Sequence, residues 1–102
     1  MIHPFIENKL PELNKIFKNH KVKKAFLFGS ACTDRFNANS DVDFLIEPGD
    51  EPDPLVKGQI LWDLYDALQD LMGRKVDMVM RGDLKNKYFI EEVNRTSEII
   101  YG

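Results

Sequence analysis

Apolar side chains recur along the chain with two different periods, and the first period is that of a helix. Within residues 4–19, the lysines and asparagines fall on one face, and the opposite face carries Leu10, Leu13, Ile16 and Phe17. Pro11 has no backbone N–H to donate, so we expect it to kink or restart this helix.

Three short apolar runs predict three β-strands. Residues 25–28 are too short and too apolar for a surface helix, so we expect a buried strand that ends at Gly29. Residues 42–46 form the second strand, after a polar loop over residues 36–40. In the third strand, residues 75–80, Val79 and the polar Asp77 face one way, and the other face carries Val76, Met78 and Met80.

A second helical pattern covers residues 60–72 and ends at Gly73, a common residue after a helix. Its apolar face carries Leu61, Leu64, Tyr65, Leu68, Leu71 and Met72. The acidic, proline-rich loop before it ends in Asp53 and Pro54, a pair typical of a helix start. Gly58 leaves open whether the helix begins there.

Towards the C-terminus, residues 84–94 predict a helix, and residues 98–101 predict a short edge strand. The side chains expected to point inward from this helix are Tyr88 or Phe89, Ile90 and Val93. The alternation of strands and helices predicts an α/β or α+β fold, in which a small mixed β-sheet is flanked by helices. Residues 1–102 would form a single domain, and the directions of its strands stay open.

Composition supports one folded domain, because 43% of the 102 residues are hydrophobic and 30% are charged. The net charge of −3 argues against broad, direct nucleic-acid binding. The single cysteine, Cys32, excludes an intramolecular disulfide and a cysteine-rich zinc site. No stretch resembles a signal peptide or a membrane span, so we expect a cytoplasmic protein without membrane contact.

The candidate chemistry begins at Gly29 and Ser30, directly after the first strand. Glycine permits a close approach that a side chain would block, and we expect Ser30 to cap a short helix of residues 31–34. Unpaired N–H groups at that turn would face an anion. Asp41 and Asp43 are two residues apart on the second strand, so their side chains lie on the same face.

Two or three carboxylates close together suit Mg²⁺, which prefers oxygen ligands and shares its coordination with substrate phosphates. Without a cation such carboxylates would repel one another. An isolated pair of surface aspartates usually serves only solvation, and Asp77 alone could face solvent on an open sheet. The ordered combination of the Gly-Ser turn, Asp41, Asp43 and Asp77 favours phosphoryl-group chemistry instead.

This ordered set, Gly29-Ser30, ten residues, then Asp41-Val42-Asp43, resembles the minimal nucleotidyltransferases of the DNA polymerase β-like superfamily. The resemblance extends through Ser40, residues 73–79 and residues 99–102, and so covers most of the chain. It implies a nucleotidyltransferase fold in which a nucleoside triphosphate is bound by Gly29, Ser30 and Ser40. It further implies a magnesium site and catalytic residues formed by Asp41, Asp43 and Asp77, with Asp77 completing the metal site or activating the acceptor hydroxyl.

By the same resemblance, the protein is expected to be a Mg²⁺-dependent transferase that moves AMP from ATP to a hydroxyl group. The implied acceptor lies on a HEPN-type helical toxin protein, which would make the chain the antitoxin of a toxin–antitoxin system. Many family members carry Ala-Arg-Gly where this chain has Cys32-Thr33-Asp34, and the nearest arginine is Arg35. This departure motivates an alternative, a non-catalytic antitoxin that neutralises its partner by occlusion.

Transfer to a small molecule such as an aminoglycoside is a third hypothesis. It is disfavoured because 102 residues leave no second domain to form the pocket, unless a homodimer supplies one. The sequence leaves open whether the protein acts as a homo-oligomer or a hetero-oligomer.

Overall fold

A computed structural model describes residues 2–33, 35–83 and 85–102. Its centre is a four-stranded sheet in the order β3-β2-β1-β4. The strands are β1 (Val22–Phe28), β2 (Val42–Pro48), β3 (Val76–Met80) and β4 (Glu98–Tyr101). β1 runs antiparallel to both β2 and β4, whereas β2 and β3 are parallel, so the predicted mixed sheet is confirmed.

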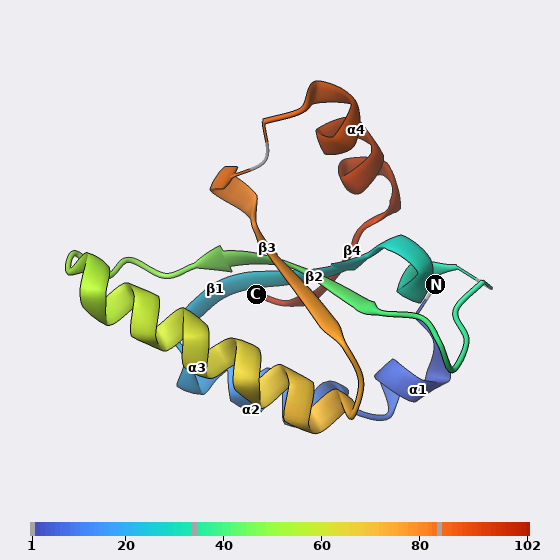
Figure 1. Ribbon diagram of the computed structural model, residues 1–102, viewed down its shortest axis with the longest axis horizontal. Coiled ribbons are helices and arrows are strands. Elements are labelled where there is room, and N and C mark those ends of the chain that lie inside the picture. The colour runs from blue at the N-terminus through green and yellow to red at the C-terminus, as the bar shows by residue number, and fades with distance from the viewer. Residues whose placement is uncertain (1, 34, 84) are drawn as a thin grey trace.

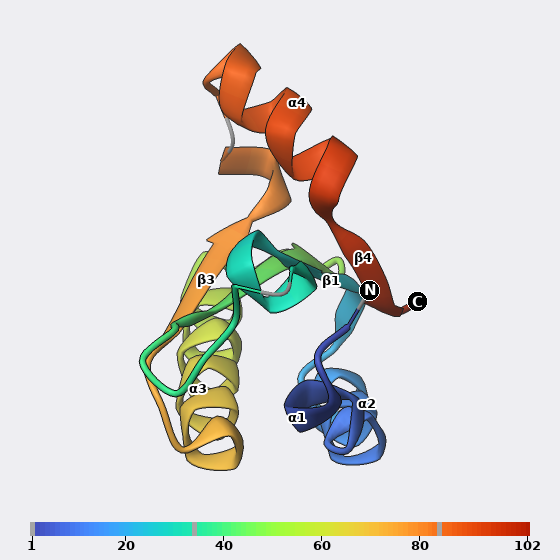
Figure 2. The ribbon, with the colours of Figure 1, turned by 90° about the vertical axis from the view of Figure 1, so that its right-hand side faces the viewer.

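Helices cover the two faces of this sheet unequally. Three of them lie on one face, α1 (Pro4–Glu7), α2 (Leu10–Asn19) and α3 (Pro54–Met72), and α4 (Lys87–Thr96) lies on the other (Figures 1 and 2). Two short 3-10 helices, η1 (Gly29–Cys32) and η2 (Arg81–Asp83), follow β1 and β3. Within the described residues, no helix combines the length and the apolar character needed to cross a membrane.

The alternation of side chains along β2 divides the sheet into a closed and an open face. Val42, Phe44 and Ile46 are fully buried under the three helices. Leu45 faces the other way and joins a smaller apolar cluster with Phe28 and Val93, beneath α4. The open face is therefore only partly covered, and it carries the remaining side chains of β2 and β3.

The predicted helix boundaries follow local chemistry closely. Pro11 lies in the first turn of α2, after a break from α1, as expected of a helix restart. Asp53 caps α3 by accepting a hydrogen bond of 2.9 Å from the backbone N–H of Leu55, and α3 continues through Gly58. Gly73 ends α3 in the left-handed conformation, at φ +65°.

Two predictions about helices are corrected. The short helix at the Gly-Ser turn begins at Gly29, so Ser30 lies inside it and does not cap it. Its expected last residue, Asp34, is outside the described residues. The C-terminal helix begins at Lys87, after an Asn86 cap, and extends to Thr96, whereas its expected first residue, Leu84, is outside the described residues. Tyr88 is exposed on this helix, and Phe89 packs edge-on against Phe28.

Arg74 fixes the loop that leads from η1 to β2. Its guanidinium donates hydrogen bonds of 2.9 and 3.1 Å to the carbonyl oxygens of Asn37 and Ser40. It also lies over the rings of Phe5 and Phe36, at 4.4 and 4.8 Å from their centroids. Because Ser40 directly precedes Asp41, this arginine anchors the entry to the aspartate-bearing strand.

We expect Arg74→Ala to destabilise the fold by about 2 kcal/mol, because two charge-assisted hydrogen bonds and two ring contacts are lost together. Urea unfolding followed by circular dichroism measures this change. Arg95→Ala is the matched control, since Arg95 makes a hydrogen-bonded ion pair with Glu92 on the helix surface and should leave the midpoint nearly unchanged. Equal effects of the two substitutions would contradict the assignment.

Candidate active site

Asp43 and Asp77 are brought together by the register of two parallel strands. Asp43 of β2 is paired directly with Asp77 of β3, so both side chains project from the open face of the sheet. Neighbouring strands are only about 4.8 Å apart, which holds the two carboxyl groups within hydrogen-bonding reach. Like charges in such a cross-strand pair are unfavourable unless a proton or a cation is shared between them.

The pKa of Asp43 is raised from 3.8 to about 6 in this position. The largest cause is partial burial, which disfavours the charged carboxylate, and the next is the hydrogen bond that the protonated Asp43 carboxyl donates to Asp77. The negative charges of Asp77 and Asp41 add to the increase, and Lys75 opposes it. The fold thus holds at least one of these carboxyl groups in an environment where a cation would be favoured.

Gly29 joins the Gly-Ser turn to this pair of carboxyl groups. It adopts φ +71°, and a Cβ at this position would lie 2.5 Å from Oδ2 of Asp43. Both the backbone conformation and the close approach therefore require glycine. The two halves of the sequence motif, Gly29-Ser30 and Asp41-Val42-Asp43, are in direct contact in the structure.

Asp41 lies just before β2, and its Oδ2 is 3.6 Å from Nζ of Lys75. Its charge reaches Asp43 strongly enough to help raise the pKa of that residue. Over residues 2–33, 35–83 and 85–102, no group of three or more His, Cys, Asp or Glu side chains forms a ready metal-binding cluster. The observed arrangement is a contacting pair, Asp43 and Asp77, with Asp41 held by Lys75.

A pocket of about 460 Å³ lies beside the pair, between η1 and α4. From the predicted site it includes Gly29, Ser30 and Asp43, and Arg35 also lines it. The remaining wall comes from Phe28, Thr33, Phe89, Glu92, Val93 and Thr96. The Ser30 hydroxyl makes no hydrogen bond within the described chain, so it is available to a ligand.

Ser40 stands apart from this pocket. Its hydroxyl accepts a hydrogen bond of 3.0 Å from the backbone N–H of Asn37, and it therefore shapes the loop before Asp41. Sequence reasoning missed the contribution of α4, whose Phe89, Glu92 and Thr96 line the pocket. The helical period indicates which face of α4 is apolar, but only the chain path places that face over Gly29 and Ser30.

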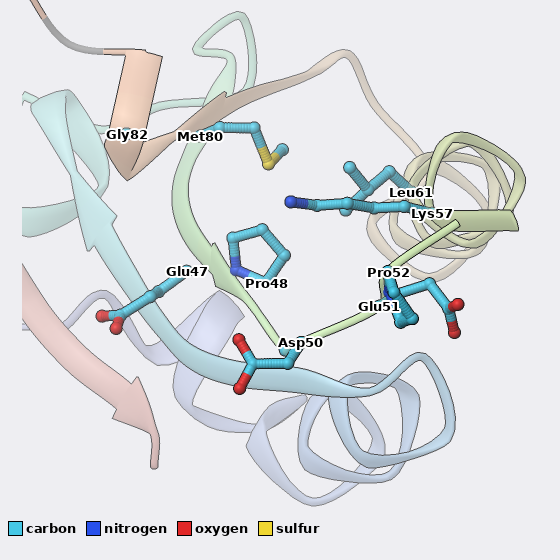
Figure 3. Close-up of a pocket in the computed structure, with 10 residues that line it drawn as sticks. Glu47, Pro48, Asp50, Glu51, Pro52, Lys57, Leu61, Met80 and Gly82 are labelled. Carbon is cyan, nitrogen blue, oxygen red and sulfur yellow. The ribbon is translucent and has the colours of Figure 1, made fainter. Parts of the chain in front are cut away.

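A larger pocket, of about 660 Å³, lies at the opposite end of β2 (Figure 3). Lys57 extends across it, while Glu47, Asp50 and Glu51 direct their carboxylates away from its centre. Two of these carboxylates are already engaged, Glu47 with Lys23 and Arg81, and Glu51 with Lys21. Although this pocket is larger, it lacks the Gly-Ser turn and the paired carboxyl groups that lie at the smaller pocket.

The family described as polymerase β nucleotidyltransferases matches residues 11–102, which include the Gly-Ser turn and all three aspartates. The chain belongs to this nucleotidyltransferase family. A protein of Methanocaldococcus jannaschii, designated by name a protein adenylyltransferase, is 36% identical over 94% of this chain and 93% of its own length. A second protein of that organism with the same designation is 32% identical over 90% of this chain and 96% of its own.

Solved structures share the fold. One described as a minimal nucleotidyltransferase superposes with a TM-score of 0.75 and 23% identity, over 96% of this chain and 95% of that one. A toxin–antitoxin crystal structure with AMP-PNP gives a TM-score of 0.69 and 21% identity, over 91% and 73%. A Shewanella oneidensis structure, described as a tri-AMPylated HEPN toxin with its MNT antitoxin, gives 0.64 and 18%, over 94% and 71%. The expected nucleotidyltransferase fold is confirmed.

We expect Gly29→Ala to disrupt the site beyond its effect on stability. The left-handed backbone costs about 1–2 kcal/mol for alanine, and the new Cβ would displace the Asp43 carboxylate. Gly73→Ala is the matched control, because Gly73 has φ +65° but no atom lies within 4 Å of the position that a Cβ would occupy there. Both variants should unfold at lower urea, whereas only Gly29→Ala should change the NMR titration of Asp43. An unchanged titration would contradict the contact.

We expect Asp43→Asn to stabilise the metal-free protein above pH 6. A raised folded-state pKa means that the native protein binds the proton more tightly than the unfolded chain. Wild-type stability therefore falls as pH rises from about 4 to about 6, and asparagine escapes this loss. After allowance for solvent screening, the difference should reach about 1 kcal/mol at pH 7 and vanish below pH 4.

Chemical unfolding of wild type and variant between pH 3.5 and pH 8 in a chelating buffer measures this difference. Asp66→Asn, at an exposed position of α3, serves as the control, and its free energy of unfolding should change with pH in the same way as that of the wild type. The raised pKa would be excluded if the free energies of unfolding of Asp43→Asn and wild type differed by the same amount at every pH.

Proposed function

We propose that the protein transfers AMP from ATP to a hydroxyl group of a partner protein, in a Mg²⁺-dependent reaction. The observation that carries the proposal is the contact between Gly29 and Asp43, which sets the Gly-Ser turn against a pair of carboxyl groups. Family membership and relatives designated protein adenylyltransferases support this choice of reaction. The nucleotide specificity follows those names and the AMP-PNP in a similar structure.

The pocket between η1 and α4 would bind the nucleotide. Ser30 offers a free hydroxyl to the triphosphate, and Gly29 lets the phosphates approach the backbone closely. Arg35 lines the same pocket and carries a cation that suits a phosphate. It would replace the arginine that many family members carry closer to the Gly-Ser turn. Phe89 and Val93 supply an apolar wall on the α4 side, which suits the nucleoside.

Magnesium fits the donors that this fold supplies. Asp43 and Asp77 offer adjacent carboxylate oxygens, and Asp41 lies close enough to influence Asp43. These three residues would hold the ion together with oxygens of the triphosphate. When bound, the ion supplies positive charge that offsets the negative charge of the reacting phosphates. Its charge would also stabilise the ionised form of Asp43, which partial burial and the neighbouring carboxylates disfavour.

In the proposed reaction the acceptor oxygen forms a bond to the α-phosphorus of ATP, and the bond from that phosphorus to the pyrophosphate oxygen breaks. The hydroxyl proton passes to a carboxylate. Asp77 is suited to receive it, because it is exposed on the edge strand β3, where a second protein can approach. Most of the rate acceleration would come from positioning and charge neutralisation, since phosphoryl transfer requires little covalent work from the protein.

We further propose that the acceptor is a HEPN-type helical toxin and that the chain acts as its antitoxin in the cytoplasm. A structure with the same fold is described as an AMPylated HEPN toxin in complex with an MNT antitoxin. This support comes from a likeness of fold, and the acceptor of the present chain is inferred from it.

Labelled ATP, the purified chain and its genetically adjacent HEPN-type protein provide the test. We expect label transfer with the wild-type chain and a loss of roughly 10²-fold or more in Asp43→Asn with Asp77→Asn, because charge stabilisation is removed. Glu12→Gln, at an exposed position of α2 outside the proposed site, should retain full transfer. Transfer that persists in the double variant would refute the site, and its absence in the wild type would refute the reaction.

Thermal unfolding separates this reaction from non-catalytic occlusion. ATP with magnesium should raise the melting temperature of the wild-type chain by mass action, and chelation should remove the increase. A flat response to ATP, GTP and CTP with magnesium would favour the occluding antitoxin.

A further inference from the structure

An apolar groove lies on the helix-covered side of the sheet, between α3 and the edge strand β3. It has a volume of about 480 Å³. Its lining consists of Gly58, Leu61, Trp62, Tyr65 and Met78. Gly58 leaves the groove open, since no atom lies within 4 Å of the position that a Cβ would occupy. The nucleotide pocket lies on the other face of the same sheet.

Large apolar side chains at this groove are exposed to solvent and not packed into the core. Trp62, the single tryptophan of the chain, is 63% exposed. Its ring packs against that of Tyr65, with centroids 6.1 Å apart. Leu55 lies two turns before Trp62 on the same helix and is 85% exposed. Exposed apolar residues gathered in this way are typical of a surface that binds another protein.

The outer rim of the groove is acidic. Asp66 follows Trp62 by one helical turn, and Asp63 and Asp70 continue the acidic side of α3. Asp63 accepts a hydrogen bond of 2.8 Å from Gln59. Asp66 and Asp70 take part in no ion pair within the described part of the chain. Lys57, the cation of α3, extends into the separate pocket shown in Figure 3.

We propose that this groove docks a cationic amphipathic helix of the acceptor protein. An apolar stripe on that helix would cover Trp62 and Tyr65, and flanking lysine or arginine side chains would face Asp66 and Asp70. The inference rests on the proposed function, in which a second protein supplies the hydroxyl. Trp and Tyr next to an open pocket are residue types that often dominate binding energy in such interfaces.

A second copy of this chain does not offer a matching helix. α2 carries lysines, but its apolar residues Leu13 and Phe17 are fully buried in the core. α4 exposes Tyr88, but its surface mixes cations with Glu91 and Glu92. The charge pattern therefore favours a different protein over self-association.

The position of the groove also suits delivery of an acceptor. Met78 lines the groove, and Asp77, its neighbour in β3, projects from the opposite face of the sheet. Because β3 is an edge strand, only the width of that strand separates the groove from the catalytic carboxyl pair. A protein anchored at Trp62 can therefore extend around this edge and place a hydroxyl near Asp77.

A designed peptide tests the groove without knowledge of the partner. A leucine–lysine amphipathic helix of about 18 residues, five turns, carries the proposed chemistry, and a leucine–glutamate peptide of the same pattern is its control. We expect the lysine peptide to shift the fluorescence emission of Trp62 to shorter wavelength, since docking removes water from the indole. The glutamate peptide should leave the emission unchanged.

Substitutions assign the binding to the groove. Gly58→Leu should weaken anisotropy-monitored binding of the labelled lysine peptide at least tenfold by filling the groove, and leucine is a better helix former than glycine, so the fold should persist. Asp66→Lys with Asp70→Lys should weaken it similarly. Tyr88→Ala, on the other face, is the control for loss of an exposed aromatic residue and should bind normally.

Equal binding of the two peptides, or equal binding by Gly58→Leu and wild type, would overturn the proposal. Self-association in sedimentation experiments that Gly58→Leu abolishes would assign the groove to a second copy and overturn it as well. The thermal shift with ATP and magnesium is measured on the same variants. A normal shift combined with failed peptide binding would refute the groove alone, and a missing shift in the wild-type chain would refute the proposed function.

Discussion

The complete burial of Val42, Phe44 and Ile46 is the constraint on which the rest of this structure depends. Side chains alternate along a strand, so placing these three under the helices sends Asp41 and Asp43 to the opposite face. The same alternation in β3 buries Val76 and exposes Asp77. A shift of one residue between β2 and the core would move apolar side chains into water and carboxylates into the core, at a large cost in free energy. The hydrophobic core therefore fixes the position of the site.

α4 covers only part of the open face of the sheet, and this partial burial determines how readily the carboxyl groups of the site ionise. Val93 of α4 packs on Phe28 and Leu45, but the helix does not extend over the whole sheet, so Asp43 lies at the margin of a small apolar cluster. Full burial would make a charged carboxylate very costly, and full exposure would leave its pKa near 4. The intermediate position holds two carboxyl groups close together while leaving them accessible to a charged ligand. Partial burial and the neighbouring negative charges make ionisation of Asp43 unfavourable, and a bound cation would offset this cost.

The edge strand β3 connects the proposed chemistry to the proposed partner surface. One face of this strand presents Asp77 beside Asp43 at the proposed nucleotide pocket, and the other presents Met78 to the groove with Trp62. An edge strand is the one place in a sheet where both faces can be reached from the same side of the molecule. A protein of 102 residues has little surface to divide between a small substrate and a large one. If one face of β3 served the nucleotide and the other the acceptor protein, the chain could bind both substrates at adjoining positions.

The sequence by itself determined the elements and their local ends. Periodicity located the strands and α3, and Pro11, Asp53 and Gly73 marked helix boundaries, because these signals act over a few residues. It also placed Asp41 and Asp43 on one face.

Only the tertiary structure decided the contacts between residues that are far apart in the sequence. The parallel register sets Asp77 against Asp43, Gly29 touches that carboxylate, and α4 closes the pocket. Arg74 anchors a loop more than thirty residues away. Such contacts depend on the directions of the strands and on the path of the chain, and the spacing of residues in the sequence predicts neither.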